Sequence, residues 1–358
     1  TVIGLDVPLA LIATGALGVL VSTMVEQPFQ QLVVALVGGV VGILALWRVE
    51  RLAAVFRAGV LVSVATTAVA WSFAATQGSF DSGSVTIATL QSIANGLLSA
   101  VLTAGAFGIL GYLFGITTSW QLMDLARPNQ PLLQRLLLEA PGTYHHSILV
   151  SNLAERAAVQ IGADALLVRV GAFYHDIGKT LHPYFFIENQ MDQPNIHSKL
   201  PPEVSAQMIS AHVTDGVKLA KEQKLPQSIQ DIIWQHHGTR LIGYFLSQAK
   251  AQASDGKSID ESKYRYPGPR PRSREAALIM LADAVEAAAR AANHPSIADV
   301  ERIVDHIFQE RIAEGELSDS DITLKDMAKA REAFLAVLRG LFHRRIDYPP
   351  VAVMSDAD

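Results

Sequence analysis

Long apolar stretches dominate the first third of the chain and predict helices that cross a membrane. Four uncharged stretches cover residues 7–25, 27–47, 58–80 and 96–116, the last within the uncharged run 82–123. Each supplies about the 20 residues that span a hydrocarbon core of about 30 Å. For any one stretch, a buried helix pair of a soluble protein is the alternative. Four stretches in 126 residues make that alternative the weaker one.

The few basic residues of this region predict its orientation. Three arginines lie between the second and third stretches and mark that connection as cytoplasmic: Arg48, Arg51 and Arg57. The connection 79–85 contains Asp81 and no Lys or Arg, so we expect it to face outward. The fourth stretch then returns the chain to the cytoplasm at Arg127. The sequence therefore predicts a multi-pass protein of the cell membrane whose later part lies in the cytoplasm.

Beyond the membrane region, apolar residues recur with the period of a helix. After a leucine stripe in 132–137, we expect helices at residues 144–160, 164–176, 203–222, 226–237, 274–292, 296–313 and 323–344. No strand alternation interrupts this pattern, so the predicted fold class is all-α throughout. We expect transmembrane helices over 1–118, a connector over 119–142, an all-helical domain over 143–348 and a tail over 349–358.

Two long connections, residues 180–199 and 253–274, separate some of these helices. Long loops in compact domains are often lids or binding loops, and are otherwise disordered. Both connections flank the candidate chemistry described below, which favours lids.

Charge and histidine content separate the two parts of the chain. The first 126 residues hold three basic and five acidic side chains, whereas all eleven histidines lie after residue 126. The 358 residues include no cysteine, which excludes disulfides, thiolate zinc sites and cysteine nucleophiles. The net charge is −5, and no run of Lys and Arg predicts a surface for duplex nucleic acid. Because the chain starts at Thr1, we expect it to be a piece of a longer protein, with only the C-terminal part of a larger membrane region.

The later part presents histidines and aspartates that could converge on metal ions. His175 and Asp176 end a predicted helix, where neighbouring side chains can turn toward one point. Asp283 lies on an apolar helix, where a lone carboxylate would cost several kcal/mol without a partner such as a metal ion or an arginine. Nitrogen and oxygen donors of this kind suit a divalent transition metal.

Five strings carry a resemblance to a known family: EAPGTYHHS at 139–147, YHDIGK at 174–179, PYFFIENQ at 183–190, QHHGT at 235–239 and YRYPGP at 264–269. With the order His, His-Asp, His, His-His, Asp, they resemble the membrane-bound 7TM-HD family of HD-domain phosphohydrolases. Its studied members are cyclic-di-AMP phosphodiesterases. The resemblance covers residues 95–348 and implies a metal-dependent phosphodiesterase that opens cyclic di-AMP to pApA.

The resemblance also implies a dinuclear site in which Asp176 bridges two ions. One ion would be held by His146, His175, Asp176 and Asp283, and the other by Asp176, His212, His236 and His237. Two ions about 3.5–4 Å apart can supply a bridging hydroxide as nucleophile and stabilise the leaving oxygen. Imidazole and carboxylate ligands without thiolates favour iron or manganese over zinc.

Further residues are candidates for contacts with the substrate. Lys179 follows Asp176 by three residues and is a catalytic candidate that could touch the phosphate. A lysine that only caps the helix C-terminus is the alternative. Tyr184, Asn189 and Arg240 are weaker candidates for base or phosphate contacts. The remaining histidines lie outside the implied ligand set: His145, His182, His197, His294, His306 and His343.

Other functions stay open at this point. HD-GYP enzymes, which act on cyclic di-GMP, carry Gly-Tyr-Pro shortly after the His-His pair, whereas here Gly238 is followed by Thr239 and Arg240. This difference argues against cyclic di-GMP. A nucleotide-binding signalling module with little turnover and an HD nucleotidase acting on mononucleotides are two further alternatives. The expected partners are cyclic di-AMP and the lipid bilayer, and the sequence leaves a homo-oligomer open.

Overall fold

A computed structural model describes residues 7–25, 27–46, 52–115, 117–190, 194–253, 258–292 and 295–341. The chain divides into two compact units, Thr1–Asp124 and Leu125–Asp358. The described residues of both units form helices and no strand, apart from one isolated bridge between Leu241 and Arg265. The predicted all-α fold class is therefore confirmed.

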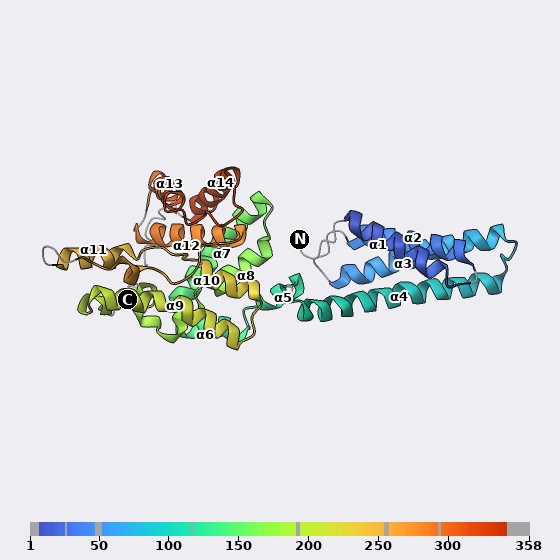
Figure 1. Cartoon of the computed structure of the whole chain (residues 1–358), viewed down its shortest axis with the longest axis horizontal. Helices are drawn as coiled ribbons and strands as arrows, with labels where there is room; N and C mark the ends of the chain where they lie inside the picture. Colours follow the sequence, from blue (N-terminus) through green and yellow to red (C-terminus); the bar gives the residue numbers. More distant parts are fainter. Residues whose placement is uncertain are drawn as a thin grey trace, which may run out of the picture. The chain divides into compact units, whose positions relative to one another are not determined.

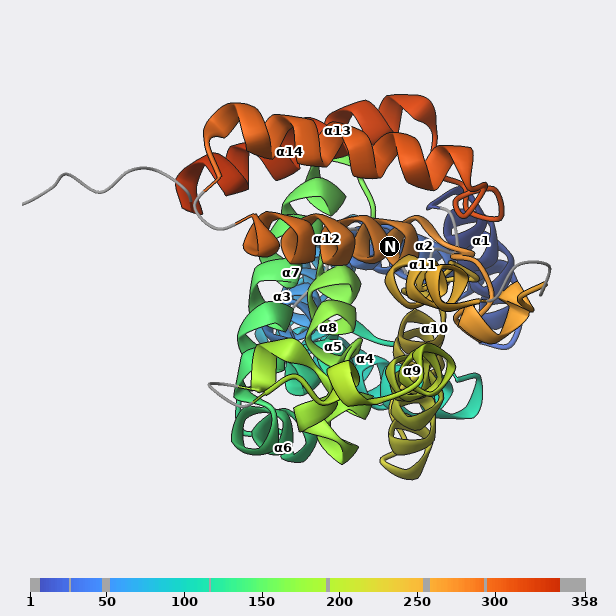
Figure 2. The same ribbon diagram turned by 90° about the vertical axis from the view of Figure 1, so that its left-hand side faces the viewer.

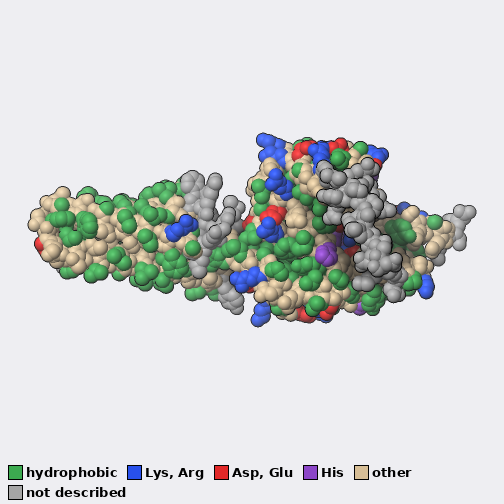
Figure 3. Space-filling view, turned by 180° about the vertical axis from the view of Figure 1, so that it is seen from behind, with side chains coloured by type: hydrophobic (Ala, Val, Ile, Leu, Met, Phe, Trp, Pro, Cys, Tyr) green, Lys and Arg blue, Asp and Glu red, His purple; other side chains and the backbone are tan. Residues whose placement is uncertain are grey.

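The first unit consists of long apolar helices that pack against their neighbours in sequence: α1 (Val7–Ser22), α2 (Pro28–Leu46), α3 (Leu52–Thr76) and α4 (Ser82–Leu113). Figure 1 shows α1 to α4 running back and forth along one direction. The face seen in Figure 3 is almost entirely apolar or uncharged over these helices. Such a surface suits lipid, because water would leave the apolar side chains unfavourably exposed.

Three of these helices, α2, α3 and α4, are long and apolar enough to cross a membrane. The fourth, α1, has only 16 residues and falls short of the usual length. The chain is therefore a membrane protein with three clear candidate spans among the described residues, and a span at α1 stays a prediction. Arg48 and Arg51, which support the predicted orientation, lie outside the described residues.

Glycines allow α3 and α4 to approach each other closely. A Cβ on Gly59 would meet the carbonyl oxygen of Gly96 at 2.6 Å, and one on Gly96 would overlap Ser63. Small residues at such crossings are typical of helices that associate in lipid. The Ser63 hydroxyl donates to the carbonyl of Gly59 at 3.0 Å, so this buried polar group is satisfied within its own helix.

The second unit begins at the end of α5 (Ser119–Leu125). It continues with α6 (Pro131–Glu139), α7 (Pro141–Ile161), α8 (Ala165–Tyr174), α9 (Pro202–Glu222), α10 (Gln227–Gln235), α11 (Gly243–Gln252), α12 (Arg274–Ala291), α13 (Ile297–Ala313) and α14 (Leu324–Leu341). Between them, the described residues form five short 3-10 helices: η1 (Ile177–Leu181), η2 (Pro183–Phe185), η3 (Ile187–Asn189), η4 (Ile196–Lys199) and η5 (Glu261–Tyr264).

The largest core of this unit lies where α7, α8, α12, α13 and α14 meet. Helix α12 is its centre, since nearly every residue from Ala276 to Ala282 is fully buried. In Figures 1 and 2, α13 and α14 lie side by side across α12. A helix buried on most of its circumference can hold a polar side chain in a fixed position, which is the situation of Asp283.

The seven helices predicted after residue 143 all occur, with ends displaced by a few residues. The capping signals explain their ends. Gly162 adopts a left-handed conformation (φ 70°) after α7, and Asp164 caps α8 by accepting from the Leu167 amide at 3.0 Å. Thr323 and Asp326 bond each other's backbone amides at 3.1 Å, as the capping-box pattern predicts.

Some elements were not predicted. Residues 180–199 contain η2, η3 and η4 and part of η1, and α11 lies in a region where no helix was expected. The predicted tail 349–358 and the last residues of the predicted domain lie outside the described residues. The boundary between the two units falls within the predicted connector.

Candidate metal centre

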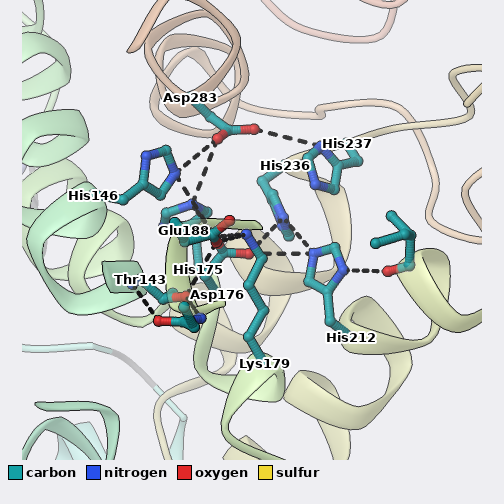
Figure 4. A network of polar contacts seen from close by, with 12 residues as sticks. Thr143, His146, His175, Asp176, Lys179, Glu188, His212, His236, His237 and Asp283 are labelled. Carbon is teal, nitrogen blue, oxygen red and sulfur yellow. Dashed lines mark hydrogen bonds and ion pairs between the residues drawn. The ribbon is translucent and has the colours of Figure 1, made fainter. Parts of the chain in front are cut away.

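Seven side chains from five parts of the second unit meet at one point: His146, His175, Asp176, His212, His236, His237 and Asp283 (Figure 4). His146 lies on α7, His212 on α9 and Asp283 on α12. The two adjacent pairs lie just beyond the last residues of α8 and α10. Six of the seven are buried, and His237 is half-buried.

The end of α8 turns His175 and Asp176 toward the same interior. Helix α8 ends at Tyr174, and Asp176 leaves helical geometry (φ −108°, ψ 16°) before η1 begins. The helix therefore ends at the pair, as the sequence predicts. Gly178 does not end it by a left-handed turn. Instead, Gly178 lets η1 touch α9, because a Cβ there would overlap the carbonyl oxygen of His212.

The two oxygens of Asp176 face different histidines. Its Oδ1 lies 3.2 Å from Nε2 of His212 and 3.7 Å from Nε2 of His236. Its Oδ2 lies 3.2 Å from Nε2 of His175 and 3.7 Å from Nε2 of His146. The carboxylate of Asp176 thus faces two groups of imidazoles, His212 with His236 and His175 with His146.

Asp283 closes the other side of the cluster. Its Oδ1 lies 3.0 Å from Nε2 of His146 and 3.9 Å from Nε2 of His175. Its Oδ2 lies 3.5 Å from Nδ1 of His237. Asp283 therefore contacts both groups of histidines (Figure 4). No arginine pairs with it among the described contacts, so the imidazoles are its partners.

Hydrogen bonds fix the rings of the buried histidines. The Nδ1 groups of His175, His212 and His236 each lie 2.6–2.7 Å from the backbone carbonyl three residues earlier, to which Nδ1–H donates. This leaves Nε2 of each ring directed into the cluster. His237 is instead held by its ring, which stacks on Tyr266 with centroids 4.1 Å apart. His146 differs again, because its Nδ1 makes a hydrogen bond to the carboxylate of Glu286.

Burial and charge set the protonation of the cluster. Burial and the nearby His175 lower the pKa of His236 to about 3, and burial with His236 holds the pKa of His237 well below its usual value. Both rings are therefore neutral at pH 7 and carry a free lone pair. Burial opposes ionisation of Asp176, but His175 and Lys179 outweigh it and keep its pKa low. Burial also opposes protonation of His146, but Asp283 and Glu286 raise its pKa to about 9.

Lys179 lies at the edge of the cluster. Its Nζ is 2.8 Å from Oδ2 of Asp176 and 2.8 Å from Oε1 of Glu188. Burial opposes its charge, but these two carboxylates raise the pKa of Lys179. The same Lys179 charge lowers the pKa of Glu188 to about 2 against the effect of burial. Lys179 is thus a fixed cation beside the bridging carboxylate.

The three weaker candidates have other partners or lie on the surface. Asn189 exchanges hydrogen bonds with Thr143, accepting from its amide at 3.2 Å and donating to its hydroxyl at 2.9 Å. Arg240 pairs with Glu314 at 3.1 Å. Tyr184 is exposed on η2. None of the described contacts joins them to the seven clustered residues, and a role in binding substrate stays a prediction for each.

The cluster fits divalent metal ions by its chemistry. Neither Nε2 of His175 nor Oδ1 of Asp176 has a hydrogen bond within the described part of the chain, although both are buried. Buried polar atoms without partners are costly, and a cation would satisfy them. One atom from each of His146, His175 and Asp176 lies within 4.8 Å of the others, and the same holds for Asp176, His212, His236 and His237.

Sequence reasoning missed several residues that support the cluster. Glu286 lies one helical turn beyond Asp283 on the same apolar helix, and this spacing could have revealed it. Glu188 stands within a string that resembles the family, but nothing in its spacing points to Lys179. Tyr266 lies in the string YRYPGP, but nothing in its spacing points to His237. Glu316 carries no local signal, although it accepts from the Thr239 amide (3.0 Å) and hydroxyl (2.7 Å) and so holds the loop after His237.

Each of the two units matches a known protein family model. A family model described as "HD domain" matches residues 143–288, and one described as "7TM receptor with intracellular HD hydrolase" matches residues 1–118. The chain belongs to this 7TM-HD family. The family indicated by the sequence motifs is thereby confirmed. The membrane model ends between α4 and α5, and the HD model covers every residue of the cluster.

Two curated relatives are named cyclic-di-AMP phosphodiesterase PgpH. The protein of Bacillus subtilis is 40% identical over 315 residues, which cover 88% of this chain and 44% of the relative. That of Listeria monocytogenes is 46% identical over 249 residues, covering 70% and 34%. The chain therefore spans less than half the length of these relatives.

A solved structure resembles the second unit. The crystal structure of the L. monocytogenes PgpH HD domain in complex with cyclic-di-AMP is 47% identical, with a TM-score of 0.58. The similarity covers 60% of this chain and the whole of that domain. The HD domain of that relative thus binds cyclic di-AMP.

Proposed function

We propose that this chain is the catalytic part of a metal-dependent phosphodiesterase that opens cyclic di-AMP to the linear dinucleotide pApA. The observation that carries the proposal is Asp176, which directs one oxygen to His212 and His236 and the other to His175 and His146. A shared carboxylate between two groups of imidazoles is what a dinuclear site requires. The two relatives named as cyclic-di-AMP phosphodiesterases support the substrate.

The two groups of side chains would hold two divalent ions, with iron or manganese the best match to imidazole and carboxylate donors. When bound, such ions activate water and neutralise the charge of a phosphodiester. His146, His175 and Asp283 would hold one ion, His212, His236 and His237 the other, and Asp176 both. The low pKa values of His236 and His237 keep their lone pairs available for this at neutral pH.

Lys179 would bind the phosphodiester. Its ammonium group is anchored by Asp176 and Glu188 and is 12% exposed, so one side of it can meet an oxygen of the phosphate. In the reaction, water adds across one P–O bond of the ring. The P–O3′ bond breaks, the 3′-oxygen takes a proton, and the phosphate stays on the 5′-oxygen of the product. Lys179 would stabilise the negative charge that develops on the phosphate.

The apolar helices would anchor this domain to the bilayer with the HD unit in the cytoplasm. The orientation rests on the arginines around the second and third predicted spans. Cyclic dinucleotides are highly charged and do not cross a bilayer unaided, so a cytoplasmic site agrees with a cytoplasmic substrate.

A substrate panel tests the proposal. The purified chain, freed of metal and reloaded with Mn²⁺ or Fe²⁺, is incubated with cyclic di-AMP, cyclic di-GMP, AMP and dATP. We expect pApA from cyclic di-AMP and much slower turnover of the other three. Faster hydrolysis of cyclic di-GMP or of a mononucleotide would contradict the substrate. Tight binding of cyclic di-AMP with no product would instead favour a signalling module.

A further inference from the structure

His146 is oriented differently from the other buried histidines of the cluster. His175, His212 and His236 each direct Nδ1 to a carbonyl of their own helix. His146 lies in α7, and its Nδ1 bonds the carboxylate of Glu286 on α12, 140 residues away in sequence. A neutral carbonyl supports three of the rings, and an anion supports the fourth.

Glu286 is built into the structure at this position. It is 5% exposed and lies three residues after Asp283, so both carboxylates project from the same face of α12. Arg290, one turn further on, lies 3.6 Å from the same oxygen of Glu286 and partly balances its charge. His146 therefore lies between two acidic side chains of one helix, with Nδ1 toward Glu286 and Nε2 toward Asp283.

This geometry fixes which nitrogen of His146 can bind a metal. A carboxylate that accepts the Nδ1–H hydrogen bond holds the proton on Nδ1, so Nε2 is the nitrogen that gives up its proton when a metal binds. The same carboxylate makes Nε2 a stronger donor to the metal than a backbone carbonyl would. We propose that Glu286 is a positioning residue that strengthens one of the two metal sites, the one formed by His146, His175, Asp176 and Asp283. In the site formed by His212, His236 and His237, no carboxylate from outside the cluster bonds a ring among the described residues, since His212 and His236 use backbone carbonyls and His237 faces Asp283. The inference rests on the dinuclear site of the proposed function.

We therefore expect Glu286 to change the metal affinity of one site and not of the other, although the two sites share Asp176. Outer carboxylates of this kind change metal affinity by about 10–100-fold. Removing the charge of Glu286 should therefore weaken the His146 site by about tenfold, and removing the hydrogen bond as well should weaken it by about a hundredfold. The His212 site should change by no more than about twofold, since none of its ligands contacts Glu286 among the described residues.

Metal-binding measurements on single-site variants test the asymmetry. Mn²⁺ uptake by the detergent-solubilised chain is measured by equilibrium dialysis and elemental analysis. His212→Ala leaves the His146 site, and His146→Ala leaves the His212 site. Glu286→Gln and Glu286→Leu are then made in each background. The matched control is Glu275→Gln on the same helix, whose carboxylate accepts from the Asp164 amide and contacts none of the ligands.

The expected result is a loss of affinity from both Glu286 variants in the His212→Ala background and almost none in the His146→Ala background. Equal affinity of Glu286→Leu and its parent at the His146 site would overturn the inference. So would the same loss in both backgrounds, because a general structural defect would act on either site. A parent chain that takes up fewer than two ions would contradict the proposed dinuclear site itself.

Discussion

At the scale of single residues, opposite charges stabilise each other inside the second unit. The buried Asp176 and the half-buried Lys179 and Glu188 form a chain of charges in which the ammonium group lies 2.8 Å from each carboxylate. Burying one charge alone would cost several kcal/mol, so each member depends on the next. Glu188 also accepts from the Thr143 hydroxyl at 3.1 Å, which ties the charge chain to the start of α7.

The low pKa of Glu188 predicts a pH-dependent stability. Its pKa falls from 4.5 to about 2 in the folded protein. Its contribution is thus fully present above about pH 4.5 and is lost as the pH falls toward 2. In the metal-free chain, Glu188→Gln should lower the free energy of unfolding at pH 7 by at most about 3 kcal/mol. The deficit should shrink between pH 4.5 and 2.5, as measured by urea unfolding followed by circular dichroism.

A surface carboxylate provides the control for this prediction. Glu261 pairs with Lys250 at 2.7 Å, but both side chains are largely exposed. Glu261→Gln should therefore leave the stability almost unchanged at every pH. A deficit of Glu188→Gln that stayed constant from pH 7 to pH 2.5 would show that its charge is not the cause.

At the scale of elements, the metal centre depends on how closely η1 and α9 approach. Gly178 and Gly216 face each other there, and the added Cβ of an alanine at 178 would overlap the backbone of α9. The contact fixes Asp176, which precedes η1, against His212 on α9. Local backbone packing thus determines the separation of two proposed ligands.

Gly178→Ala should push η1 and α9 apart. We expect a loss of about 1–3 kcal/mol of stability, typical of an overpacked core, and weaker metal binding at His212. Gly243→Ala is the matched control, since no atom lies within 4 Å of its added Cβ. That variant should be neutral or slightly stabilising. Equal stability and metal binding of the two variants would contradict the proposed role of the contact.

The sequence predicts the elements unevenly, for physical reasons. Helices with an apolar stripe and clear caps, such as α8 between Gly162 and His175, are predicted to within a few residues. Helix α11 is not, because its sequence GYFLSQAKAQ has no stripe of helical period. The residues gathered around Asp176 are predicted from the order of histidines and aspartates. A support such as Glu316 is not, because its partner Thr239 lies 77 residues away. Glu286 is missed as well, although its spacing from Asp283 places it on the same face of α12.

At the scale of the whole molecule, apolar spans and an HD domain share one chain. The absence of cysteine makes the predicted orientation straightforward to test, because any introduced thiol is unique. Ser79 lies in the exposed connection between α3 and α4, and Lys250 lies on the surface of α11. The two positions belong to the sides of the membrane that the arginine distribution predicts to be outside and inside.

We expect Ser79→Cys to react with a membrane-impermeant maleimide on intact spheroplasts. Lys250→Cys should react only after the spheroplasts are permeabilised. The unsubstituted chain, which has no thiol, is the control for background labelling. The reverse labelling pattern would place the HD domain outside the cytoplasm, where it could not reach a cytoplasmic substrate, and would contradict the predicted orientation.

The most direct test of the dinuclear phosphodiesterase is a metal titration followed by product analysis. Metal-free chain receives increasing equivalents of Mn²⁺, and pApA formed from cyclic di-AMP is measured at each step, for the unsubstituted chain and for Asp176→Ala. We expect activity to track occupancy of the second ion, and Asp176→Ala to lower the rate by at least about 10³-fold, equivalent to about 4 kcal/mol. Turnover without metal, full activity at one equivalent, or an active Asp176→Ala variant would contradict it.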